Sequence, residues 1–216
     1  MKFTLFLFIN QTLLLLFLSC SNPKKNKTSP NLTEIEMTNN DKKTKSMTDI
    51  ETQKNGYFEL INLCLGDSKK KVVISFIDTL RNYNGDENFY TTLNYVKDYL
   101  DNNEIHFIMA LDWKQEITDL VWRINSSMKD NFNESIELPN PEVYGKNKSV
   151  SYKNVFIDFD NAVNKKGYKL GFINTDGDEY VIIVHKTADE KEVENAISKI
   201  GYNYLTASSS LISPKN

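Results

Sequence analysis

Residues 168–185, YKLGFINTDGDEYVIIVH, have the pattern of a β-hairpin. The tip at residues 175–178 combines aspartates, which can bond their own backbone, with Gly177, which we expect to take a positive φ. The returning run at residues 180–184 has no polar alternation, and such a run is typical of a strand covered on both faces. We therefore expect this hairpin to lie in the middle of a sheet.

One further strand is predicted before the hairpin, at residues 105–111, and one after it, at residues 202–206. With the helices between them, the order from residue 105 is strand, helix, helix, strand, strand, helix, strand. If the second helix is an insertion in the first crossover, this is the βαββαβ order of a ferredoxin-like fold, whose first and third strands are central. The fold class is therefore predicted as α+β, with N-terminal helices followed by a ferredoxin-like sandwich and a four-stranded, mainly antiparallel sheet.

Two of the predicted helices begin with the pattern of a capping box. Asp112 can cap a helix while Gln115 reaches back to it, and Asp189 can do the same with Glu192. Apolar residues at helical spacing then give each helix a buried side. The whole chain is expected to divide into a signal peptide (residues 1–19), a lipidated cysteine with a disordered tether (20–55), a helical part (56–104), the α/β sandwich (105–207) and a tail (208–216).

The beginning of the chain resembles a bacterial lipoprotein signal. Lys2 precedes an apolar run, and the run ends in Leu16-Phe17-Leu18-Ser19-Cys20, which is similar to a lipobox. The resemblance implies that Cys20 becomes the lipid-modified first residue and anchors the protein to a membrane. Basic residues directly after Cys20 favour a periplasm-facing position in a Gram-negative bacterium. An ordinary cleaved signal with an incidental cysteine is the alternative.

Charge and cysteine content restrict the partners that the domain can have. From Gly56 onward there are 18 Lys and Arg and 24 Asp and Glu, a net charge of 18 − 24 = −6, with no basic stripe, which argues against a nucleic-acid partner. The only cysteine besides Cys20 is Cys64, which lies in an apolar run and is predicted to be a buried thiol.

Few residues offer catalytic or metal chemistry. His106 and His185 are the only histidines, and the predicted topology places them at one end of the sheet, where a third ligand such as Asp189 or Glu104 would complete a metal site. Two strand-end histidines bonded to water or backbone are the simpler interpretation. The chain has no G-x-S-x-G, P-loop or H-E-x-x-H motif. We predict no cofactor and no catalytic residue.

Several residues together resemble an uncharacterised bacterial family of domains of unknown function. They are Asp112-Trp113-Lys114, Trp122, Tyr144-Gly145, Thr175, Asp178 and Tyr180, and the resemblance covers residues 105–205. It implies no catalytic residues.

A non-catalytic binding or interaction role is the leading hypothesis, with a protein of the envelope as the partner. The rival is a periplasmic hydrolase or metal-dependent enzyme that uses dispersed Asp, Glu and His. A deep pocket lined by His106 or His185 and at least two carboxylates would favour the rival, and a flat face would favour binding. The predicted interaction surface consists of Asp112, Trp113, Glu116, Asp176, Asp178 and Tyr180.

Overall fold

A computed structural model describes residues 49–83, 86–87 and 91–212 of the chain. The predicted signal peptide, Cys20, most of the predicted tether and the last four residues of the tail lie outside the described residues. No helix within the described ranges is both long and apolar enough to cross a membrane.

Three helices come first in the described chain, and the four strands follow with helices between β1 and β2 and between β3 and β4. The helices are α1 (Ile50–Cys64), α2 (Asp67–Asp78), α3 (Thr92–Asn102), α4 (Ile117–Phe132), α5 (Val155–Asn164) and α6 (Glu190–Lys199). The strands are β1 (Ile108–Asp112), β2 (Tyr168–Asn174), β3 (Glu179–Lys186) and β4 (Asn203–Thr206). Short 3-10 turns in the described ranges are η1 (Pro141–Tyr144), η2 (Thr187–Asp189) and η3 (Ser210–Ile212). The predicted α+β class is confirmed.

The predicted hairpin forms between β2 and β3, with Ile173 opposite Val181 in an antiparallel ladder. The residue with positive φ at its tip is Asp176, at +55°, so the assignment of that role to Gly177 was wrong. The Asn174 side chain accepts a hydrogen bond from the Asp176 amide at 3.1 Å, and the Thr175 hydroxyl accepts one from the Gly177 amide at 3.3 Å. These two bonds stabilise the tip, and aspartate tolerates the left-handed conformation well.

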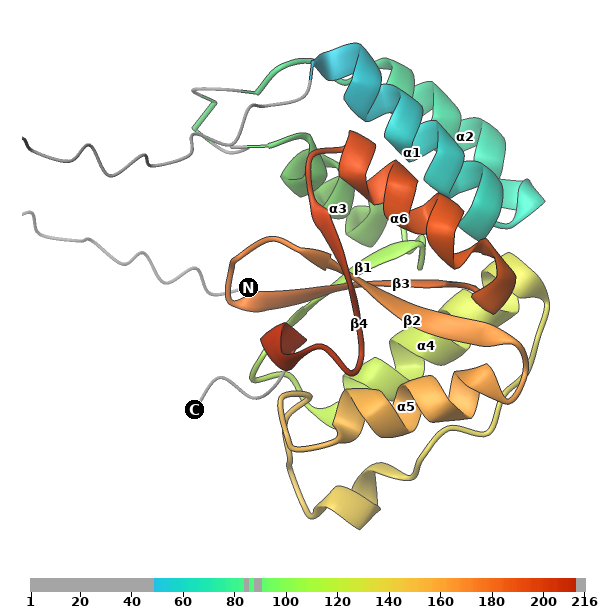
Figure 1. Ribbon diagram of the computed structural model, residues 1–216, viewed down its shortest axis with the longest axis vertical. Coiled ribbons are helices and arrows are strands. Elements are labelled where there is room, and N and C mark those ends of the chain that lie inside the picture. Colours follow the sequence, from blue (N-terminus) through green and yellow to red (C-terminus); the bar gives the residue numbers. More distant parts are fainter. Residues whose placement is uncertain (1–48, 84–85, 88–90, 213–216) are drawn as a thin grey trace, which may run out of the picture. The chain divides into compact units, whose positions relative to one another are not determined.

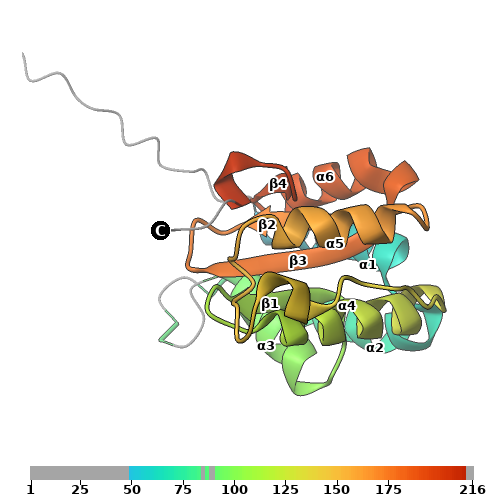
Figure 2. The ribbon, with the colours of Figure 1, turned by 90° about the horizontal axis from the view of Figure 1, so that it is seen from below.

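The strand order is β1-β3-β2-β4, and all three neighbouring pairs are antiparallel. Figure 2 shows β4, β2, β3 and β1 in this order from top to bottom. The sheet is therefore four-stranded and antiparallel as predicted, but the ferredoxin-like order was wrong. β1 is an outer strand, and β4 pairs with β2 instead of β1.

The changed order explains why helices cover both faces of the sheet. In a ferredoxin-like order the two crossovers run in opposite directions across the sheet, and the usual right hand puts both helices on one face. Here the crossover from β1 to β2 and the crossover from β3 to β4 run in the same direction across the sheet, but β1 and β3 are antiparallel. Two right-handed crossovers of this kind must place their helices on opposite faces of the sheet. Figure 1 shows this arrangement, with α4 and α5 below the sheet and α6 above it together with α1, α2 and α3.

Two cores result, one on each face, and β3 contributes to both. Val181 and Ile183 pack with α1, α3 and α6, whereas Ile182 and Val184 pack with α4 and α5. All four side chains are at most 1% exposed. The continuous apolar run at residues 180–184 is thus explained by two covered faces, because successive side chains of a strand point to opposite sides.

Helix α1 begins earlier than the sequence indicated. Asp49 caps it by accepting a hydrogen bond from the Thr52 amide at 3.0 Å, and Ile50 is the first helical residue. Residues 49–55, expected to belong to the tether, are therefore part of the folded domain. Gly56 lets α1 approach α6 closely, since a Cβ there would lie 2.7 Å from the Ala196 carbonyl oxygen.

Neither predicted capping box caps a helix. Asp112 is still paired with Glu179 in the sheet, and α4 begins only at Ile117 after a tight turn. Asp189 precedes α6, but its side chain makes no capping hydrogen bond, because η2 leads directly into the helix and leaves Asp189 at φ −96° and ψ 9° instead of the extended conformation of a typical N-cap.

Candidate functional site

The hairpin end of the sheet brings together most of the predicted interaction surface. Asp112 at the end of β1 pairs with Glu179 at the start of β3, so it lies beside the hairpin tip that carries Asp176 and Asp178. These three aspartates are exposed, and so is Glu116 directly before α4. The fold thus gathers carboxylates from two separate parts of the sequence at one edge.

Asp112 also closes the turn that follows β1 through its backbone hydrogen bonds. Its N–H donates to the Gln115 side-chain oxygen at 2.8 Å, and its carbonyl accepts from the Gln115 N–H at 2.9 Å. The carboxylate of Asp112 accepts from the Lys114 N–H at 2.8 Å. The residues of the predicted capping box therefore close the turn after β1 and leave the backbone of Asp112 directed away from β3.

The two aromatic residues of the predicted surface are less accessible than expected. Tyr180 is 6% exposed, and its ring packs edge-on against Phe156 of α5 at 4.7 Å between centroids. Trp113 is half-buried against the same core, with the Lys114 ammonium 4.9 Å from the centre of its ring. Tyr180 therefore belongs to the core beneath the surface.

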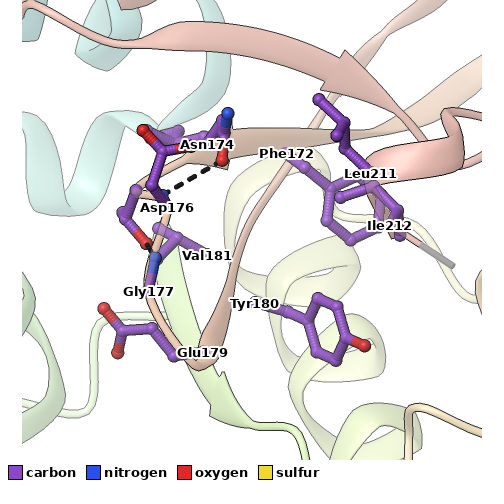
Figure 3. A pocket seen from close by; sticks show the side chains of 11 residues that line it. Phe172, Asn174, Asp176, Gly177, Glu179, Tyr180, Val181, Leu211 and Ile212 are labelled. Atoms are coloured by element: carbon purple, nitrogen blue, oxygen red, sulfur yellow. Dashed lines mark hydrogen bonds between the residues drawn. The ribbon is translucent and has the colours of Figure 1, made fainter. Parts of the chain in front are cut away.

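A small cavity of about 200 Å³ lies under the hairpin tip and will be called the hairpin-tip cavity. Figure 3 shows Asn174, Asp176 and Gly177 on one side of it and Phe172, Leu211 and Ile212 on another. Tyr180 also lines it, and the Tyr180 hydroxyl is buried without a hydrogen-bond partner among the described residues. Burial raises the pKa of Tyr180, so this hydroxyl stays protonated and can donate.

A larger, open groove of about 490 Å³ runs beside the outer strand and will be called the β1 groove. Its floor is formed by Ile108 and Ala110 of β1. Helices α3 and α4 and strand β3 provide the polar walls of the groove. The residues of those walls are Asn94, Lys97, Asp98, Asp101, Arg123 and Glu179.

Two ion pairs cross the β1 groove. Lys97 of α3 binds Glu179 of β3. Arg123 of α4 binds Asp101 of α3 at 3.1 Å, and thereby joins helices from opposite faces of the sheet. Glu179 lines both the β1 groove and the hairpin-tip cavity, so the two hollows are neighbours at the hairpin end.

His106 lies before β1 and contacts α4. Its Nδ1 atom is 3.4 Å from a carboxylate oxygen of Asp130, and its ring meets Trp122 edge-on at 4.8 Å. The His106 carbonyl accepts from the Asn131 side chain at 2.8 Å. These contacts hold the segment before β1 against α4.

His185 is fully buried and takes part in a different cluster. Its Nδ1–H donates to the Lys186 carbonyl at 2.8 Å, which leaves Nε2 to accept from the Tyr204 hydroxyl at 2.9 Å. Burial lowers the pKa of His185 and raises that of Tyr204, so both groups are neutral. Lys169 and Glu190 form an adjacent ion pair at 2.6 Å.

The two histidines thus have separate partners, Asp130 for one and Tyr204 for the other. Within the described ranges, no group of three or more His, Cys, Asp or Glu residues could hold a metal ion. Neither the hairpin-tip cavity nor the β1 groove is lined by a histidine. The hairpin end of the sheet thus combines exposed carboxylates with two neighbouring hollows.

The β1 groove was missed by sequence reasoning. Lys97, Asp98 and Glu179 are charged residues on the exposed sides of predicted elements, and such residues carry no local sign of a site. Only Ala110, a small residue within an otherwise bulky strand, marks the place where the groove opens.

Comparison with known protein families gives a match over most of the chain. The profile of a family described as a domain of unknown function, DUF6630, matches residues 52–208. No curated protein and no solved structure matches the chain. The match begins within α1, so the N-terminal helices are part of the family domain, and the expected resemblance to a domain of unknown function is confirmed over a longer range. The chain belongs to the DUF6630 family.

Proposed function

We propose that this protein is a lipid-anchored envelope protein whose folded domain binds a partner protein through the hairpin end of its sheet. The anchor is the lipid on Cys20, and the domain faces the periplasm of a Gram-negative bacterium. The lipobox-like segment 16–20 supports the anchor. The acidic hairpin end supports the binding role.

The observation that carries the binding role is the juxtaposition of exposed carboxylates with two hollows. Asp112, Asp176 and Asp178 lie at the hairpin end, where Glu179 lines both the hairpin-tip cavity and the β1 groove. Carboxylates at such a rim steer and orient a partner of opposite charge, while a recessed apolar floor provides the contact area. The partner is accordingly a protein with a basic surface.

Replacement of the anchoring cysteine tests the location. Cys20→Ala should move the protein from the membrane fraction to the soluble fraction, and Cys64→Ala should leave it with the membranes because Cys64 is 1% exposed within a core. Mass spectrometry of the mature amino terminus should show the acyl chains in the parent protein and in Cys64→Ala, and should show none in Cys20→Ala. Sedimentation of Cys20→Ala with membranes after a high-salt wash would contradict the anchor.

Site-specific photo-crosslinking in intact envelopes tests the binding surface. A photoreactive residue at position 112 or 178 should give a discrete crosslinked product. The same residue at position 194, on the exposed side of α6, should give none. Equal crosslinking at all three positions, or none at any of them, would show that the hairpin end is not a selective interface.

A further inference from the structure

The outer edge of β1 has unpaired backbone groups at defined residues. Because the N–H and C=O of Asp112 both bond Gln115, Asp112 is not hydrogen-bonded to Glu179 across the ladder. Antiparallel ladders alternate between bonded and non-bonded pairs, so Ile108 and Ala110 also direct their N–H and C=O away from β3. Within the described ranges, the outward groups of Ile108 and Ala110 have no hydrogen-bond partner.

The same two residues form the floor of the β1 groove. The unpaired backbone edge and the groove are therefore one feature. Natural proteins protect such edges with charged side chains or covering elements. The protection here is the Arg123–Asp101 ion pair, in which the Arg123 side chain is 14% exposed and that of Asp101 is 69% exposed. Ile108 is 3% exposed, so this ion pair must open before another chain can reach the edge.

The charges of the β1 groove define the occupant that fits. Its walls carry two cations, Lys97 and Arg123, and three carboxylates, Asp98, Asp101 and Glu179. Each cation is already bound to a carboxylate, and Asp98 is exposed without an ion pair among the described residues. An incoming chain with basic side chains satisfies Asp98 and replaces Arg123 at Asp101.

A second copy of this chain does not fit the same edge. The local two-fold axis of an antiparallel strand pair is perpendicular to the sheet, so two β1 strands would bring two α3 helices together on one face. Asp98 and Asp101 of both copies would then meet, and like charges in contact repel. The charges thus favour a different chain.

We propose that the β1 groove binds an extended, basic segment of a partner protein, which adds a fifth strand to the sheet by pairing with Ile108 and Ala110. This inference rests on the proposed function as a binding protein and specifies how the partner is held. The backbone bonds give affinity, and the carboxylates of α3 and β3 select basic side chains.

The test uses a fluorescent heptapeptide, Lys-Thr-Lys-Val-Lys-Thr-Lys, and the full chain purified in detergent. Anisotropy should report saturable binding, and hydrogen exchange at the Ile108 and Ala110 amides should slow when the peptide is bound. A control peptide has the same sequence, but every second backbone nitrogen is methylated, so it keeps its charge and loses the N–H groups that would donate to β1. It should bind at least about tenfold more weakly than the unmethylated peptide. Asp98→Lys should weaken binding of the basic peptide by a similar factor, and Glu194→Lys on α6 should not.

Three kinds of result would overturn the inference. One is the absence of saturable binding of the basic peptide. Another is equal binding of the methylated control peptide, or unchanged hydrogen exchange at the Ile108 and Ala110 amides when the basic peptide is bound. Either would mean that the peptide is held by electrostatic attraction without pairing to β1. The third is dimerisation of the chain alone with protection of the same amides, because the occupant would then be a second copy. The peptide assay needs neither membrane nor native partner, so crosslinking at positions 112 and 178 remains an independent test of the proposed function if the peptide fails to bind.

Discussion

Two tyrosine hydroxyls on opposite faces of the sheet differ in their hydrogen bonding. The Tyr204 hydroxyl donates to the Nε2 atom of His185 at 2.9 Å. The Tyr180 hydroxyl is buried without a hydrogen-bond partner among the described residues. A buried polar group without a partner lowers stability, whereas a satisfied one is costly to remove. The two residues are therefore a matched pair for measurement.

Tyr180→Phe is expected to keep or raise stability, by up to about 1 kcal/mol, because the orphaned hydroxyl is removed and the ring stays. Tyr204→Phe is expected to lower stability by about 1–3 kcal/mol, because Nε2 of His185 loses its donor in a buried place. Urea unfolding of both variants and the parent measures the difference. A loss of stability in Tyr180→Phe as large as that in Tyr204→Phe would mean that the Tyr180 hydroxyl has a partner after all.

The buried imidazole of His185 makes stability depend on pH. Burial holds the folded-state pKa of His185 below the value of about 6.5 that it has when unfolded, so the unfolded chain binds the proton more readily. The contribution of the neutral ring to stability is therefore complete above about pH 6.5 and is lost as the pH falls toward the folded-state pKa.

We expect the urea midpoint to decrease between about pH 7.5 and about pH 5.5. In His185→Gln the midpoint should be lower at all pH values, and its change over this interval should be smaller. An identical pH dependence in the parent and in His185→Gln would assign the effect to another group.

Contact between elements depends on small residues at two crossings. On α1, a Cβ at Gly56 would lie 2.7 Å from the Ala196 carbonyl oxygen and 2.7 Å from Ile200 Cγ2 near the end of α6. In β2, a Cβ at Gly171 would lie 2.5 Å from the Tyr204 ring. The close contact of α1 with α6 therefore requires glycine at position 56, and the close contact of β2 with the Tyr204 ring of β4 requires glycine at position 171.

Gly56→Ala should destabilise the domain by about 1–3 kcal/mol, because α1 and α6 must separate, and this loss exceeds the gain of about 1 kcal/mol in helix propensity. Asn55→Ala is the matched control, since Asn55 is the exposed neighbour on the same helix and its replacement should stabilise the domain by about 0.5 kcal/mol. Thermal unfolding of both variants gives the comparison. Stabilisation by both substitutions would show that the helices can repack around the added methyl group.

At the scale of the whole molecule, one sheet joins two hydrophobic cores. Cys64 lies in the core under α1, α2, α3 and α6, and Trp113 packs against the core under α4 and α5. Since β3 contributes alternate side chains to both cores, loss of one exposes half of the same strand. We therefore expect the two cores to unfold together.

Thiol labelling and tryptophan emission can report on the two cores separately. In a Cys20→Ala background, Cys64 is the single thiol, and burial raises its pKa and blocks its reaction in the folded state. Its labelling should appear at the same denaturant concentration as the change in tryptophan emission. Labelling at a distinctly lower concentration would show that the helices above the sheet detach first.

The sequence by itself determined the elements of this protein that depend on neighbours in the chain. The hairpin at residues 168–185 and the burial of Cys64 follow from local periodicity and turn chemistry, since these act over a few residues. The sequence also assigned Asp112 and the hairpin tip to one predicted interaction surface, and the pairing of Asp112 with Glu179 brings them side by side.

The tertiary structure alone decided the order of the strands and the β1 groove. A continuous apolar run indicates that both faces of a strand are covered. The side-chain pattern does not indicate whether the backbone edge of the strand is paired with a neighbour. The runs at residues 105–111 and 180–184 therefore look alike, although β1 is an outer strand and β3 an inner one. The groove needs Asp98, Arg123 and Glu179 from three separate elements, and only the packing of α3 and α4 around the open edge of β1 brings them together.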